Sequence, residues 1–210
     1  MDTFPADIFT EPDPDPHTLR NLGPLTALAG IWEGKGVDVH PSADGTEEAE
    51  YTERMELEPI DPQTNGPQLL YGLRYHTRIV QVGEIETFHD QVGYWLWEPA
   101  TGVILQTVAI PRGQVAMAMG TASADAKSFE LHAVADTPVN GICSGKFLEY
   151  GFKTTEYRIV VTINDDGTWS YELDTVLVVR GREGTFHHTD RAKLTKVAPP
   201  SPNPLARAVL

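Results

Sequence analysis

The chain has 210 residues, 16 Lys and Arg against 30 Asp and Glu, a formal net charge of −14 and a sequence isoelectric point of about 4.8. A chain this acidic, with no basic stripe, is repelled by nucleic-acid phosphates and anionic membranes, so we expect neither as a partner. Its 40% hydrophobic residues can fill one core, and we expect one domain with flanking tails.

The single cysteine, Cys143, excludes an internal disulfide, and we expect an ordinary, partly buried thiol. The first residues lack the basic and apolar regions of a signal peptide, and no apolar run is long enough to span a membrane. We therefore expect a cytoplasmic protein.

Residues 1–16 contain four prolines and five acidic residues but no Lys or Arg, so we expect an acidic arm that is disordered or loosely draped. Residues 17–29 carry leucine at every third position, interrupted by Gly23 and Pro24. This pattern predicts two short helical turns that close one end of the domain.

A G-x-W-x-G-x-G motif follows at Gly30, Trp32, Gly34 and Gly36. The glycines allow backbones to approach closely, and Trp32 supplies a large apolar side chain whose N–H needs a partner. This combination suits the closed end of a small antiparallel barrel.

Alternation of apolar and polar residues then predicts strands as far as Val197. The expected strands span residues 31–40, 49–57, 69–80, 84–97, 103–110, 114–121, 129–134, 155–163, 169–179 and 185–197. Residues 135–150 are glycine-rich and ambiguous, and residues 198–210 form a proline-rich tail.

About ten strands joined by short turns favour an all-β fold, an antiparallel up-and-down β-barrel over residues 17–197 that encloses a ligand cavity. A two-sheet jelly roll is the alternative, because its long connections would suit residues 135–150.

Several short motifs, in this order and spacing, resemble the nitrobindin family, which includes the haem-binding domain of a THAP-type protein. The motifs are Gly30–Gly36, Leu70–Tyr71, Phe88–Trp95, Ile110–Val115 and a last strand that contains His187 and His188. The resemblance implies a ten-stranded barrel like those of fatty-acid-binding proteins and lipocalins. It also implies ferric haem b with a last-strand histidine as axial ligand, and nitric oxide binding or peroxynitrite isomerisation.

The last strand departs from the family pattern His-Leu-x-Ala-x-Leu-x-Arg. Alignment on Ala192, Leu194 and Lys196 places Thr189 at the position of the ligand. His188 is one residue early and should point to the opposite face, whereas His187 has the matching parity but lies about 7 Å further along the strand. The candidate cofactor-binding residues are therefore His188, His187 and Thr189, and the candidate iron ligands are His188 and His187, with Asp190 as an orienting acceptor.

Other chemistry has weaker support. A small metal site built from His76, His89 and the last-strand pair is geometrically conceivable, but no compact ligand motif supports it. No nucleophile elbow or phosphate-binding loop occurs. The tryptophans and tyrosines at Trp95, Trp97, Trp169 and Tyr171 indicate core packing or a flat pocket wall.

Three functional hypotheses follow: a barrel that binds haem or another hydrophobic molecule, a haem-dependent peroxynitrite isomerase, and a haem-free protein that binds a lipid or fatty acid. The first and third are binding functions, which we favour over an enzyme. A homodimer is left open.

Overall fold

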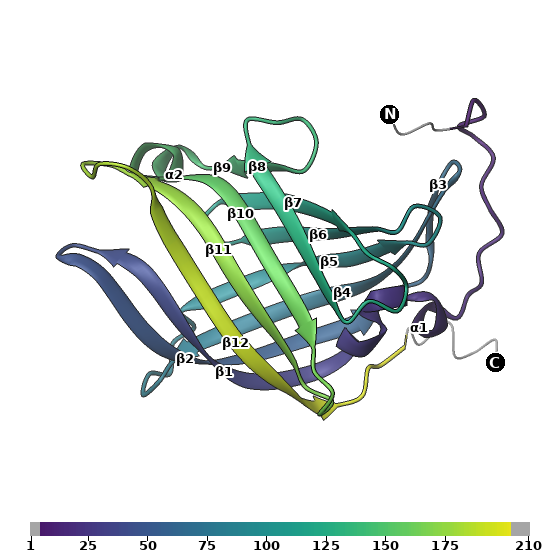
Figure 1. Cartoon of the computed structure of the whole chain (residues 1–210), viewed down its shortest axis with the longest axis horizontal. Coiled ribbons are helices and arrows are strands. Elements are labelled where there is room, and N and C mark those ends of the chain that lie inside the picture. The colour runs from purple at the N-terminus through teal and green to yellow at the C-terminus, as the bar shows by residue number, and fades with distance from the viewer. Residues whose placement is uncertain (1–4, 203–210) are drawn as a thin grey trace.

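The computed structural model of the chain describes residues 5–202 and shows a barrel of long, tilted strands (Figure 1). The helical elements are α1 (Thr18–Asn21), the 3₁₀ helix η1 (Gly23–Leu28) and α2 (Lys146–Gly151). The strands are β1 (Gly30–Ser42), β2 (Gly45–Pro59), β3 (Gln63–Asn65), β4 (Gln68–Gln81), β5 (His89–Glu98), β6 (Val103–Ile110), β7 (Gln114–Thr121), β8 (Ser128–Ala135), β9 (Gly141–Ser144), β10 (Phe152–Ile163), β11 (Trp169–Val179) and β12 (Phe186–Ala198).

The sheet closes on itself. Its order is β2-β1-β12-β11-β10-β8-β9-β7-β6-β5-β4-β3, and an additional β2–β4 pairing completes the ring. The long strands follow one another around this ring. The short strand β3 forms an antiparallel hairpin with the start of β4, and β9 is inserted between β8 and β7. The predicted all-β, up-and-down barrel of about ten strands is therefore confirmed, and the jelly-roll alternative is wrong.

Helices α1 and η1 close the end of the barrel opposite α2, as Figure 1 shows. Leu22, Leu25 and Leu28 are completely buried there. Gly23 has a positive φ of 54°, and a Cβ at this position would lie 2.5 Å from the Trp97 ring, so only glycine fits. The helical turns predicted from the leucine spacing are confirmed.

The G-x-W-x-G-x-G motif begins β1 next to this closed end. Trp32 is 1% exposed, and its indole N–H donates a 2.7 Å hydrogen bond to the Leu28 carbonyl. Gly36 lies opposite Tyr51 on β2, and a Cβ on Gly36 would be 2.2 Å from the tyrosine ring. The motif thus lets β1 pass close to a large inward side chain.

Several regions differ from the sequence-based expectation. The strand expected over residues 84–97 begins only at His89, because residues 82–87 form a turn and bends, and short β3 lies in a stretch where no strand was expected. The ambiguous residues 135–150 contain β9 and most of α2. Cys143 is exposed rather than partly buried, because it lies in β9 opposite Val115, which is also exposed.

Residues 5–16 have no helix or strand and contact β3, where the Thr64 hydroxyl donates a 2.8 Å hydrogen bond to Glu11. The expectations for residues 1–4 and 203–210 lie outside the described residues, and the division into arm, barrel and tail stays a prediction. Within residues 5–202, no helix has the length and apolar character needed to cross a bilayer.

Candidate functional site

The barrel contains a cavity of about 660 Å³, a size typical of small-molecule sites. Its walls carry apolar side chains from strands on all sides, and Phe147 and Leu148 of α2 extend the lining to one end of the barrel. The main apolar lining residues are Met55, Ile79, Trp95, Val108, Ile159, Trp169 and Leu173.

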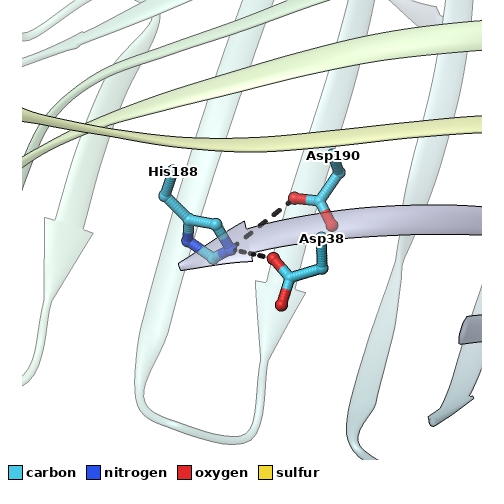
Figure 2. A group of neighbouring side chains, drawn as sticks. All are labelled: Asp38, His188 and Asp190. Atoms are coloured by element: carbon cyan, nitrogen blue, oxygen red, sulfur yellow. Dashed lines mark hydrogen bonds and ion pairs between the residues drawn. The ribbon is translucent and has the colours of Figure 1, made fainter. Parts of the chain in front are cut away.

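Four polar side chains form a group in the cavity wall where β1 and β12 pair; we call them the mouth cluster (Asp38, His40, His188 and Asp190). The buried Asp38 carboxylate accepts a 2.7 Å hydrogen bond from His188 Nε2 and a 2.6 Å hydrogen bond from His40 Nδ1. His188 Nε2 also lies 3.7 Å from Asp190 Oδ2, so that this nitrogen faces two carboxylates (Figure 2).

The mouth cluster shifts the pKa values of its members in different directions. Burial would raise the pKa of Asp38, but the hydrogen bond from His188 and the charges of both histidines hold it below its ordinary value. Burial would lower the pKa of His188, but its carboxylate neighbours raise it. Burial raises the pKa of Asp190 to about 6. Both the raised pKa of His188 and the lowered pKa of Asp38 favour the charged forms of the pair.

A second polar group lies deeper in the cavity, and we call it the inner network (Glu53, Tyr171 and Tyr51). The Tyr171 hydroxyl donates a 2.8 Å hydrogen bond to Glu53 Oε2, and the Tyr51 hydroxyl lies 3.0 Å from that of Tyr171. Burial raises the pKa of Glu53 to about 8, although the bond from Tyr171 lowers it. Glu53 is therefore a neutral acid at pH 7.

Several buried polar atoms of the cavity wall have no hydrogen-bond partner within the described part of the chain. They are Glu53 Oε1, Thr77 Oγ1, Trp95 Nε1 and Trp169 Nε1. Buried polar groups are normally hydrogen-bonded, and such exceptions point to an absent water or ligand. The cavity is thus an apolar pocket with a few polar groups available to a bound molecule.

The three candidate residues of the last strand point in two directions. His188 lines the cavity, whereas Thr189 does not, and His187 is exposed on the outside, 2.8 Å from Asp174. The pairing of β12 with β11 is regular over these positions, so no bulge changes the alternation. The prediction that His188 and Thr189 point to opposite faces of the strand is correct. The expectation that Thr189 and His187 share the face that points into the barrel is wrong, because His188 lies on that face.

The other two histidines singled out from the sequence are also separated. His76 lies 3.1 Å from Asp90 and does not line the cavity, whereas His89 does line it. Burial lowers the pKa of His89 and favours its neutral form. A metal site that combines His76 with His89 and the last-strand pair is therefore wrong.

Sequence reasoning missed Asp38, His40, Glu53 and Tyr51, and it singled out Tyr171 only as core packing or a pocket wall. The signal for the mouth cluster was a mirrored pair of motifs, Asp38-x-His40 in the first strand and His188-x-Asp190 in the last. Closure of the barrel pairs these strands and sets Asp38 directly opposite Asp190.

Residues 21–196 match the family model described as a THAP4-like, heme-binding beta-barrel domain. The chain belongs to this family. The match covers the whole ring of strands and confirms the resemblance to the nitrobindin family.

Among solved structures, the crystal structure of Rv2717c from M. tuberculosis is similar to this nitrobindin-family chain, with a TM-score of 0.60 and 23% sequence identity. The similarity covers 88% of this chain and 99% of that one, and at this identity it supports the fold alone. A search of curated proteins gives no match.

Proposed function

We propose that this chain binds a small, largely apolar molecule inside the barrel and does so without haem. The observation that carries the proposal is the cavity of about 660 Å³, with apolar walls and a few unpartnered polar atoms. Pockets of this size and composition bury most of the surface of a small organic ligand.

Haem is the ligand named in the family description, but this chain has no histidine at the family's ligand position, and the histidines of its cavity form hydrogen bonds with other side chains. An axial ligand must offer the iron a free imidazole nitrogen from inside the barrel. Thr189 has no such nitrogen and lies outside the cavity lining. His188 lines the cavity, but its Nε2 donates to Asp38 and faces Asp190, which leaves only Nδ1 for an iron ion. The other two histidines of the lining also have one nitrogen engaged, His40 Nδ1 with Asp38 and His89 Nε2 with Gln91. We therefore assign no nitric oxide or peroxynitrite chemistry to this chain.

A neutral fluorescent probe, 1-aminoanthracene, tests binding inside the cavity. Ala116 lines the cavity and its neighbour Met117 does not, so Ala116→Trp should fill the space while Met117→Trp leaves it open. We expect the wild type and Met117→Trp to bind one probe per chain, and Ala116→Trp to lose at least tenfold in affinity. Equal affinity in all three proteins, or no binding to the wild type, would overturn the proposal.

Hemin tests the second half of the proposal. After hemin is added to the tag-free chain and the excess is removed by gel filtration, we expect no Soret band at one haem per chain. A sharp band at one haem per chain would contradict this expectation. Its loss in His188→Ala, but not in His187→Ala, would identify His188 as the axial ligand. The extract of the natively purified chain, analysed by mass spectrometry, then identifies any copurified apolar ligand.

A further inference from the structure

We propose that Asp38, His188 and Asp190 form a binding site for a divalent transition-metal ion in the wall of the cavity. The inference does not depend on the apolar ligand, because it rests on these three side chains alone. They come from opposite ends of the chain and meet only because β1 and β12 pair (Figure 2).

The donor atoms already lie close to the geometry that an ion requires. One nitrogen of His188 and one carboxylate oxygen from each aspartate all lie within 4.8 Å of one another. His188 Nε2 is 2.7 Å from Asp38 Oδ1 and 3.7 Å from Asp190 Oδ2. Two atoms that share a zinc ion at about 2.1 Å each lie roughly 3.0 to 3.5 Å apart. Small side-chain rotations would therefore complete the site.

The charges also favour a cation. Asp38 and Asp190 are direct cross-strand partners, an arrangement that is destabilising for two like charges. The Asp38 side chain is 2% exposed and that of Asp190 is 15% exposed, so water screens their repulsion poorly. Within the described residues, the Asp190 carboxylate accepts no hydrogen bond, and its nearest cationic atom is His188 Nε2 at 3.7 Å.

A bound ion would replace the proton on His188 Nε2, which passes to solvent, and would neutralise both carboxylates at once. His40 would then act as a positioning residue, because its 2.6 Å hydrogen bond to Asp38 Oδ2 leaves Oδ1 directed at the ion. One imidazole and two carboxylates suit Zn²⁺, Mn²⁺ or Co²⁺ better than Mg²⁺ or Ca²⁺, which prefer oxygen ligands alone.

The site would keep an open side. All three ligands line the cavity, so a further coordination position would be available to water or to the polar end of a bound molecule. Three protein ligands with one open position are typical of reactive or ligand-binding metal sites, whereas structural zinc sites are closed by four.

The test uses the full, tag-free chain after chelator treatment and dialysis. Titration with Co²⁺ should give visible ligand-field bands that saturate at one ion per chain, and calorimetry with Zn²⁺ should give the same stoichiometry. Asp190→Asn should weaken binding at least tenfold. The same substitution removes the buried like-charge pair, so it should leave the melting temperature of the metal-free protein unchanged or raise it.

The outer face of β12 offers a matched control. His187 and Asp174 form a histidine–aspartate pair of similar length, 2.8 Å, that is outside the cavity. His187→Ala should keep the cobalt bands and stoichiometry, whereas His188→Gln should lose them. Absence of saturable binding, binding unaffected by Asp190→Asn and His188→Gln, or loss of binding in His187→Ala would overturn the site. Because these readouts need no organic ligand, they are independent of the 1-aminoanthracene assay.

Discussion

At the scale of single residues, Glu53 shows how burial sets the protonation state of a polar group in the cavity. Its carboxyl group is buried, and among the residues that the structure describes only one of its oxygens has a hydrogen-bond partner, the Tyr171 hydroxyl. Burial disfavours the ionised form, which is why the pKa rises to about 8. As a neutral acid, Glu53 can donate its remaining O–H to an acceptor on a molecule in the cavity.

The raised pKa of Glu53 makes stability depend on pH. Because the folded state keeps a proton that the unfolded state loses near pH 4.5, this contribution is present at low pH and is lost as pH rises toward 8. We expect the free energy of unfolding to fall by about 1 kcal/mol per pH unit in this window. Glu53→Gln should flatten the slope, as measured by urea unfolding at several pH values.

Glu50 provides the control, because it is exposed on the same strand. Glu50→Gln should keep the wild-type slope. If Glu53→Gln had the slope of the wild type, Glu53 would be ionised in the folded state and could not serve as a donor in the cavity.

At the scale of elements, α1 and η1 form a helical plug that closes one end of the barrel and should stabilise it. Leu25 of η1 is completely buried against the core, so Leu25→Ala should lower the free energy of unfolding by about 3 kcal/mol. Thr26→Ala, at an exposed neighbouring position, should cost less than about 1 kcal/mol. Urea unfolding measures both. A cost for Leu25→Ala as small as that for Thr26→Ala would mean that the plug does not stabilise the barrel.

The elements themselves were largely predictable from sequence, since period-two alternation, turn residues and the leucine spacing are local signals. Which side chains of β12 face the cavity was harder to predict. Ala192 and Leu194 are buried, and this parity places His188 and Asp190 inside. Alignment with the family pattern instead indicated that position 189 faces inward, because the family's histidine stands three residues before the alanine that aligns with Ala192.

The mouth cluster could not be read from local pattern. Asp38 and His188 are 150 positions apart, and the residues around one of them do not indicate that it contacts the other. The two mirrored motifs come together only when the barrel closes and Asp38 pairs with Asp190 across β1 and β12. The inner network has the same origin, since Glu53 meets Tyr171 across the barrel interior from a strand that is not its neighbour in the sheet.

At the scale of the whole molecule, the proposed metal site and the cavity should be coupled. Without metal, Asp38 and Asp190 present two carboxylates in this part of the wall, and Arg112 is the only Lys or Arg that lines the cavity among the described residues. The metal-free chain should therefore bind decanol more tightly than decanoate. A bound Zn²⁺ ion would neutralise the aspartates and offer its open position to the carboxylate of decanoate. The uncharged hydroxyl of decanol would interact with the ion only weakly.

We expect Zn²⁺ to tighten decanoate binding about tenfold, or about 1.4 kcal/mol, and to change decanol binding less than threefold. Linkage requires decanoate to tighten Zn²⁺ binding by the same factor. Fluorescence of Trp95 and Trp169, which line the cavity, can follow both titrations. Asp190→Asn should remove the coupling while the cavity stays intact. An equal effect of Zn²⁺ on both ligands, or coupling that persists in Asp190→Asn, would show that the ion does not bind beside the cavity ligand.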